Sequence, residues 1–88
     1  MADVVLELYG IARKRAGTAE FRADAATLGE ALVALARAHP TLEGEVVRGG
    51  RLAAPWRASL DGKAFVEDPL TPLPDRARVV ILSGLAGG

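Results

Sequence analysis

The sequence predicts an α+β fold, in which a mixed sheet of four to five strands carries one main helix across one face. Three observations support this prediction. Apolar, strand-like segments stand near both ends of the chain, at residues 4–9 and 79–82. One capped, amphipathic segment lies between them, at residues 27–38. A hairpin sequence, Asp61-Gly62, separates two further strand-like segments.

Size and composition limit the function classes. The chain has 88 residues, enough for one domain with a single modest core. Eleven positive and eleven negative side chains balance, which argues against a nucleic-acid or membrane-surface binder. We find no apolar run that could span a bilayer and no signal peptide, so a cytoplasmic location is expected. Without cysteine and with a single histidine, His39, no metal site is expected.

The first third of the chain predicts a hairpin. In residues 4–9, one face carries Val4, Leu6 and Leu8, while the other carries Val5, Glu7 and Tyr9. Gly10 ends this strand, and residues 11–17, which include the cations Arg13-Lys14-Arg15, are expected to be a connection. Residues 18–23 alternate around Phe21 and predict a second, antiparallel strand.

The main helix is expected over residues 27–38. Thr27 and Glu30 form a capping box, in which each side chain accepts a hydrogen bond from a free amide of the first turn. Leu28, Leu32 and Leu35 recur at helical spacing and form an apolar stripe. Pro40 disfavours helical angles at the preceding residue, so the helix should end at position 39.

The second half predicts three strands separated by irregular segments. Residues 41–55 are the least regular; a short helical turn with Leu42, Val46 and Val47 is expected to cover the core before a Gly49-Gly50 loop. Residues 56–60 and 63–66 flank the Asp61-Gly62 turn as strands. Three prolines exclude regular structure from residues 67–75, where Leu70 and Leu73 are expected under the sheet. Residues 79–82 are apolar throughout, as in a central strand.

The strand order that buries most apolar surface places the first and last strands side by side and parallel, in the centre of the sheet. That arrangement is a β-grasp. One helix covers only one sheet face, so the other face should be open and should display an apolar patch of the kind that marks a partner surface. The expected partner contacts are Leu82, Val80 and Tyr9 on this face, and Arg13 in the connection after the first strand.

The last strand leads into a small-residue end, Ser83-Gly84-Leu85-Ala86-Gly87-Gly88. We therefore divide the chain into a domain at residues 1–82 and a tail at residues 83–88. Glycine lacks a Cβ atom, so two terminal glycines could pass through a channel too narrow for side chains. The Gly88 carboxylate would then reach a partner's active site, with Gly87, Ala86, Leu85 and Gly84 recognised along the channel.

This order of elements with a Leu-Ala-Gly-Gly end resembles the ubiquitin-like sulfur carrier family, and most closely its molybdopterin synthase small subunits. The resemblance spans nearly the whole chain. Its landmarks are the opening strand with Arg13 and Gly17 after it, the helix start at Thr27, the stop at Pro40, the Asp61-Gly62 turn, Leu73 and the Gly87-Gly88 end.

The resemblance implies a chemistry for Gly88. An E1-like activating enzyme would use ATP to adenylate the carboxylate, and a sulfur donor protein would displace AMP to leave a thiocarboxylate. The chain has no cysteine, so the sulfur must come from outside. In a molybdopterin synthase, Gly88 would enter the large subunit, which would supply the catalytic groups. The chain itself would be a cosubstrate rather than an enzyme, with no permanently bound cofactor.

Three alternatives stay open at this point. The family usually has an acidic turn where this chain has Asp75-Arg76-Ala77-Arg78, and a proline pair where it has Ser83-Gly84. These differences allow a carrier for another acceptor, in tRNA thiolation, thiamine synthesis or cysteine synthesis. A ubiquitin-like modifier would instead join Gly88 to lysines of target proteins. An interaction module with an inert tail is the fourth reading.

Overall fold

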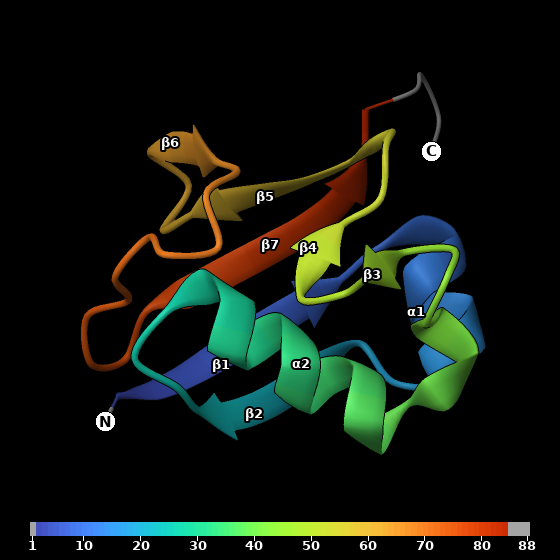
Figure 1. The fold of residues 1–88 in the computed structure, drawn as a ribbon, viewed down its shortest axis with the longest axis horizontal. Helices are drawn as coiled ribbons and strands as arrows, with labels where there is room; N and C mark the ends of the chain where they lie inside the picture. The colour runs from blue at the N-terminus through green and yellow to red at the C-terminus, as the bar shows by residue number, and fades with distance from the viewer. Residues whose placement is uncertain (1, 85–88) are drawn as a thin grey trace.

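The computed structural model describes residues 2–84 and contains a five-stranded mixed sheet in the order β2-β1-β7-β5-β6 (Figure 1). Its strands are β1 (Asp3–Leu8), β2 (Glu20–Asp24), β5 (Trp56–Leu60), β6 (Ala64–Val66) and β7 (Arg78–Ser83). Helix α2 (Leu28–Ala38) crosses one face of this sheet. The predicted α+β, β-grasp architecture is therefore confirmed.

The first and last strands form the centre of the sheet. β1 and β7 are parallel, with Leu6 opposite Val79 and Leu8 opposite Ile81, while β2 and β5 flank them in antiparallel pairing. Val4, Leu6 and Leu8 are buried together with Val79 and Ile81. At about 1.5–3 kcal/mol for each fully buried aliphatic side chain, this double row is a large part of the hydrophobic stabilisation. The predicted parallel central pair is confirmed.

Helix α2 begins and ends for the reasons that the sequence indicates. The Thr27 hydroxyl accepts a hydrogen bond from the Glu30 amide at 3.3 Å, and the Glu30 carboxylate accepts one from the Ala26 amide at 2.9 Å. Leu28, Leu32 and Leu35 are buried against the sheet. Their stripe fixes which face of the helix meets the core.

Residues 11–17 do not form the irregular connection that we expected. They belong largely to a second helix, α1 (Gly10–Ala16), whose Ala12 is fully buried. Gly17 closes it in the left-handed conformation, at φ 75°, and its amide donates to the Arg13 carbonyl at 2.9 Å. A helix this short depends on tertiary contact rather than on a stripe of its own, and a single buried residue gives little sequence signal.

Residues 41–55 contain more regular structure than expected. Of the predicted helical turn only Leu42 lies in a helix, the 3₁₀ helix η1 (Pro40–Leu42), whereas Val47 begins a strand; Leu42, Val46 and Val47 are all buried, as expected of residues that cover the core. After η1, β3 (Val47–Arg48) and β4 (Arg51–Leu52) form a small hairpin that the sequence did not reveal. Gly49 and Gly50 make its turn, both at positive φ.

The hairpin between β5 and β6 matches its prediction, since Asp61 and Gly62 both have positive φ, at 53° and 69°. Of the two leucines expected under the sheet, Leu73 is buried, but Leu70 is 76% exposed and that prediction is wrong. The Asp68 carboxylate accepts a hydrogen bond from the Leu70 amide at 2.9 Å, and the Asp68 carbonyl accepts one from Thr71. This local turn leaves the Leu70 side chain in solvent.

Neither helix in residues 2–84 has the length and hydropathy needed to cross a membrane.

Gly29 sets the distance between α2 and the 67–75 segment. Its amide donates to the Pro69 carbonyl at 2.8 Å, and a Cβ atom built on it would lie 2.9 Å from Pro69 Cβ and 3.0 Å from Pro69 O. We expect Gly29→Ala to lower the free energy of unfolding by about 1–3 kcal/mol, because a backbone must move. Urea unfolding measures this change.

Two results calibrate that measurement. Arg37→Ala, at an exposed position of the same helix, should change stability by less than about 0.5 kcal/mol. If Gly29→Ala instead stabilises the protein by about 1 kcal/mol, helix propensity outweighs the Pro69 contact and our reading of Gly29 is wrong.

Candidate functional site

The chain leaves the sheet at a defined point. Ser83 is the last residue of β7 and lies opposite Trp56 of β5. The next amide, that of Gly84, donates a hydrogen bond to the Pro55 carbonyl at 2.6 Å. The end of β7 therefore lies beside the loop that connects β4 to β5 (Figure 1). We call this place, Ser83 and Gly84 with Pro55, the tail exit.

Position 84 requires glycine because there is no room for a Cβ atom. A Cβ atom there would lie 2.8 Å from the Pro55 carbonyl oxygen and 3.4 Å from Cδ of Arg57. Real Cβ atoms do not approach a backbone oxygen so closely, so a side chain would push the two strands' ends apart. Sequence reasoning placed Gly84 among the residues recognised by a partner; the structure gives it a packing role as well.

The remaining predicted tail residues, Leu85, Ala86, Gly87 and Gly88, lie outside the described residues. Their roles, and the division into residues 1–82 and 83–88, stay predictions.

The sheet face opposite α2 carries the predicted partner contacts. Along β7, Val79 and Ile81 point to the helix and are buried, whereas Val80 and Leu82 alternate with them and are half-buried. Tyr9 is 46% exposed, and its hydroxyl donates to Glu7 of the same face at 3.2 Å. The structure thus brings Val80, Leu82 and Tyr9 to one side of the sheet, which we call the open face.

Arg13 belongs to helix α1 rather than to the open face itself. α1 follows the carboxyl end of β1, and the tail exit follows the carboxyl end of β7. Because β1 and β7 are parallel, both features lie at the same edge of the sheet (Figure 1). The Arg13 side chain is exposed and, with Lys14, borders a shallow hollow between α1 and the loop to β2. It is available to a partner that approaches this edge.

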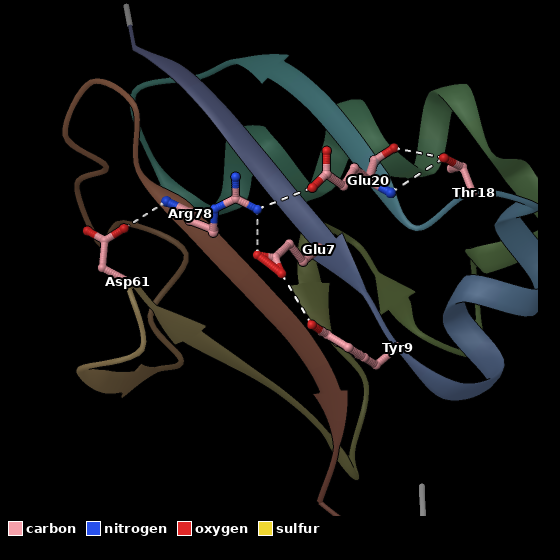
Figure 2. Close-up of polar contacts among 6 residues, drawn as sticks. All are labelled: Glu7, Tyr9, Thr18, Glu20, Asp61 and Arg78. Carbon is pink, nitrogen blue, oxygen red and sulfur yellow. Dashed lines mark hydrogen bonds and ion pairs between the residues drawn. The ribbon is translucent and has the colours of Figure 1, made fainter.

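The open face also carries an ionic network that sequence reasoning missed (Figure 2). Nη1 of Arg78 donates to Glu7 Oε2 at 2.6 Å and to Glu20 Oε2 at 3.2 Å, joining the three strands β7, β1 and β2. The Arg78 amide donates to the Asp61 carboxylate at 2.8 Å, which ties the β5–β6 turn to the start of β7. The hydrogen bond to Glu7, and after it the one to Glu20, raises the pKa of the Arg78 guanidinium above its ordinary value.

This network has a consequence for docking. The Arg78 cation is already matched by two carboxylates within the chain, so a partner that covers it need not supply an anion. The signal was present in the sequence as Arg78 in place of the family's acidic turn. Its meaning depends on the register that sets Arg78 opposite Val5, two residues before Glu7 and on the same sheet face.

Among residues 2–84, no group of three or more histidine, aspartate or glutamate side chains could hold a metal ion. The tail exit and the open face together make up the candidate site: a strand end beside a sheet face. Such a site presents a chain end and a surface to other proteins.

Comparison with known proteins gives structural neighbours of the whole chain. No protein-family model matches the sequence, and a search of curated proteins found no relative. Among solved structures, the crystal structure of small archaeal modifier protein 1 from Haloferax volcanii superposes with a TM-score of 0.83 and 25% sequence identity, covering 99% of this chain and 100% of that one.

Two further structures share the fold at lower identity. The putative molybdopterin converting factor, subunit 1, from Pyrococcus furiosus has a TM-score of 0.75 and 16% identity, covering 97% of this chain and 100% of that one. A chain of the Amycolatopsis orientalis BexX/CysO complex has a TM-score of 0.80 and 20% identity, covering 97% of this chain and 99% of that one. The chain therefore has the ubiquitin-like β-grasp fold, and the resemblance to ubiquitin-like sulfur carriers that the sequence indicates is confirmed by its structural neighbours.

We expect Arg78→Gln to lower the urea midpoint, because Glu7 and Glu20 lose their shared cation while the chain keeps a side chain of similar length. The raised pKa means that the Arg78 contribution is present at every pH below the ordinary arginine value and is lost only in strong alkali. The difference from wild type should therefore be equal at pH 7 and pH 9. It should shrink in 1 M salt, since the pairs are partly exposed. A salt-independent difference would contradict an ionic role.

Gly84→Ala should disturb the tail exit while leaving the core folded. We expect loss of protection of the residue-84 amide in hydrogen exchange, because the new Cβ atom and the Pro55 carbonyl cannot keep their present separation. Backbone NMR shifts should move at Pro55 to Arg57 and little in α2. Gly62→Ala is the control: its Cβ atom meets open space but its left-handed φ of 69° strains the β5–β6 turn, so it should lower stability and leave the NMR shifts at Pro55 to Arg57 unchanged. An unchanged exchange rate at residue 84 would show that the contact does not hold the strand end.

Proposed function

We propose that the chain is a sulfur carrier that acts as the small subunit of molybdopterin synthase in molybdenum cofactor biosynthesis. The observation that carries the proposal is the direct continuation of the central strand β7, through Gly84, into the sequence Leu85-Ala86-Gly87-Gly88. A rigid strand aims the end of the chain, and glycine lets that end enter a narrow active site. Solved proteins of carrier and modifier type share the fold over nearly the full length.

The chemistry falls on the Gly88 carboxylate. A carboxylate is a poor electrophile, so an E1-like activating enzyme joins it to the α-phosphate of ATP and releases pyrophosphate. A sulfur donor protein then delivers sulfur at the oxidation level of sulfide, AMP leaves, and a thiocarboxylate remains. This group is a soft nucleophile, and it is the only strong sulfur nucleophile that a chain without cysteine can carry.

The open face supports a large subunit that binds the carrier stably. Val80 and Leu82 are half-buried next to the tail exit, and Tyr9 is exposed on the same face. A large subunit that covers them would bury apolar surface while it receives the tail. In this reading the catalytic groups belong to the large subunit and the carrier works in the cytoplasm.

A second candidate function is a ubiquitin-like modifier. The observation that favours it is the structural similarity to the small archaeal modifier protein of Haloferax volcanii, which covers 99% of this chain at 25% identity. The first step is the same adenylation. The acyl group then passes to the amine of a lysine on another protein, which forms an isopeptide bond and leaves no sulfur on Gly88.

One intact-mass experiment separates these functions. The purified chain, whose mass first establishes that it ends at Gly88, is incubated with the activating enzyme of its own organism, ATP and a sulfide source. We expect a mass gain equal to replacing one oxygen by sulfur, mapped to Gly88 and absent from a variant that lacks Gly88. Copurification with a large subunit should accompany it.

Other outcomes assign the other functions. Gly-Gly remnants on lysines of other proteins, without a thiocarboxylate, would establish the modifier. A thiocarboxylate without a large-subunit complex would point to another acceptor, in tRNA thiolation, thiamine synthesis or cysteine synthesis. No adenylation by an enzyme that is active on another carrier would contradict both proposals and leave an interaction module.

A further inference from the structure

A cation, Arg57, lies beside the tail exit. It lies on β5, opposite Leu82, and so belongs to the open face. Its Cδ atom would be 3.4 Å from a Cβ atom at position 84, which places the start of its polar group beside the departing chain. Any protein that receives the tail and covers Leu82 and Gly84 therefore also covers Arg57.

The Arg57 side chain is held by an aromatic ring. Its guanidinium carbon lies 4.9 Å from the ring centre of Phe65, a cation–π contact. Phe65 stands on the edge strand β6, opposite Ser59, and is 57% exposed. The guanidinium therefore lies over the ring, and within residues 2–84 no ion pair occupies its N–H donors. We call these two residues the Arg57–Phe65 pair.

Within the described residues 2–84, no carboxylate pairs with the charge of Arg57. Arg78, on the same face, has Glu7 and Glu20 at 2.6 and 3.2 Å. Arg57 forms no ion pair with any carboxylate of residues 2–84. Covering an unmatched guanidinium with a protein surface is unfavourable unless that surface brings an anion, whereas covering Arg78 needs none. A partner that covers the open face therefore has to supply an anion at Arg57.

We propose that the Arg57–Phe65 pair is a recognition site for a carboxylate side chain of the activating enzyme, which makes Arg57 and Phe65 specificity-determining residues for adenylation of Gly88. The inference rests on the proposed function, because it needs an enzyme that takes the tail. A guanidinium binds a carboxylate through two parallel hydrogen bonds, and the contact with the Phe65 ring restricts the positions that the Arg57 side chain can take.

Reach distinguishes a carboxylate of the enzyme from the phosphates of ATP. A tail threaded extended into an active site places the Gly88 carboxylate roughly 13 Å beyond Gly84, at 3.3 Å or so per residue. Arg57 lies level with Gly84. The reacting phosphates are therefore out of its range, and the anion that meets Arg57 belongs to the rim of the tail channel.

The test is steady-state adenylation, followed by pyrophosphate release, with wild type, Arg57→Ala, Arg57→Gln and Phe65→Ala. For both Arg57 variants we expect the KM for the carrier to rise about tenfold at low salt, with a smaller change in kcat, since the interaction positions the carrier and does no chemistry. Phe65→Ala should raise it about threefold, because the cation keeps its charge but loses its stacking partner. Added salt should reduce the difference from wild type.

Arg22→Ala is the matched control. Arg22 lies on the open face too, but on β2, at the far side of the sheet, and it is paired with Asp3 at 3.6 Å. Its removal makes the same change in net charge, so the carrier KM should stay within about twofold of wild type. Thermal unfolding of each variant separates lost recognition from lost structure.

Each unexpected result would contradict a different claim. A carrier KM for Arg57→Ala and Arg57→Gln equal to that of wild type overturns the recognition site while the proposed function stands. A rise in the KM for ATP alone assigns Arg57 to the phosphates and also overturns it. An equal rise for Arg22→Ala shows a general charge effect and no site. If wild type itself is not adenylated by an active enzyme, the proposed function fails and the inference fails with it.

Discussion

The parallel pairing of β1 with β7 is the contact on which the rest of the molecule depends. It joins residues 3–8 to residues 78–83 and so closes a loop of nearly the whole chain, an entropic loss that the two buried rows of aliphatic side chains must offset. The same pairing decides where function can lie. Because the strands are parallel, their carboxyl ends meet at one edge, which brings α1 and the tail exit together.

Most of the fold could be predicted from the sequence because its signals are local. Alternation in β1, the Thr27 cap and the Asp61-Gly62 turn each act within a few residues. Two expectations that failed have different causes. Helix α1 is stabilised by burying Ala12, which no pattern within seven residues reveals. Leu70 is apolar and so was expected in the core, but a hydrogen bond from its own amide to the nearby Asp68 carboxylate turns its segment outward.

The candidate site divides in the same way. The Gly87-Gly88 end can be recognised by reading the sequence, and it is the part that carries the proposed chemistry. The surroundings of that end arise from register between strands far apart in the chain. Gly84 meets Pro55 because β7 pairs with β5, and Arg78 meets Glu7 because β7 pairs with β1. Neither contact can be predicted from the spacing of residues along the sequence.

The two arginines of the open face show why burial and charge have to be considered together. Arg78 and Arg57 project from neighbouring strands of the same face, and composition alone would count both as binding cations. Arg78 is bonded to two carboxylates of the chain and serves to hold three strands together. Arg57 is stacked on Phe65 and has its charge unmatched in residues 2–84. A docking surface gains specificity where an unpaired charge requires a counter-charge from the partner, and here that charge, Arg57, lies beside the tail exit.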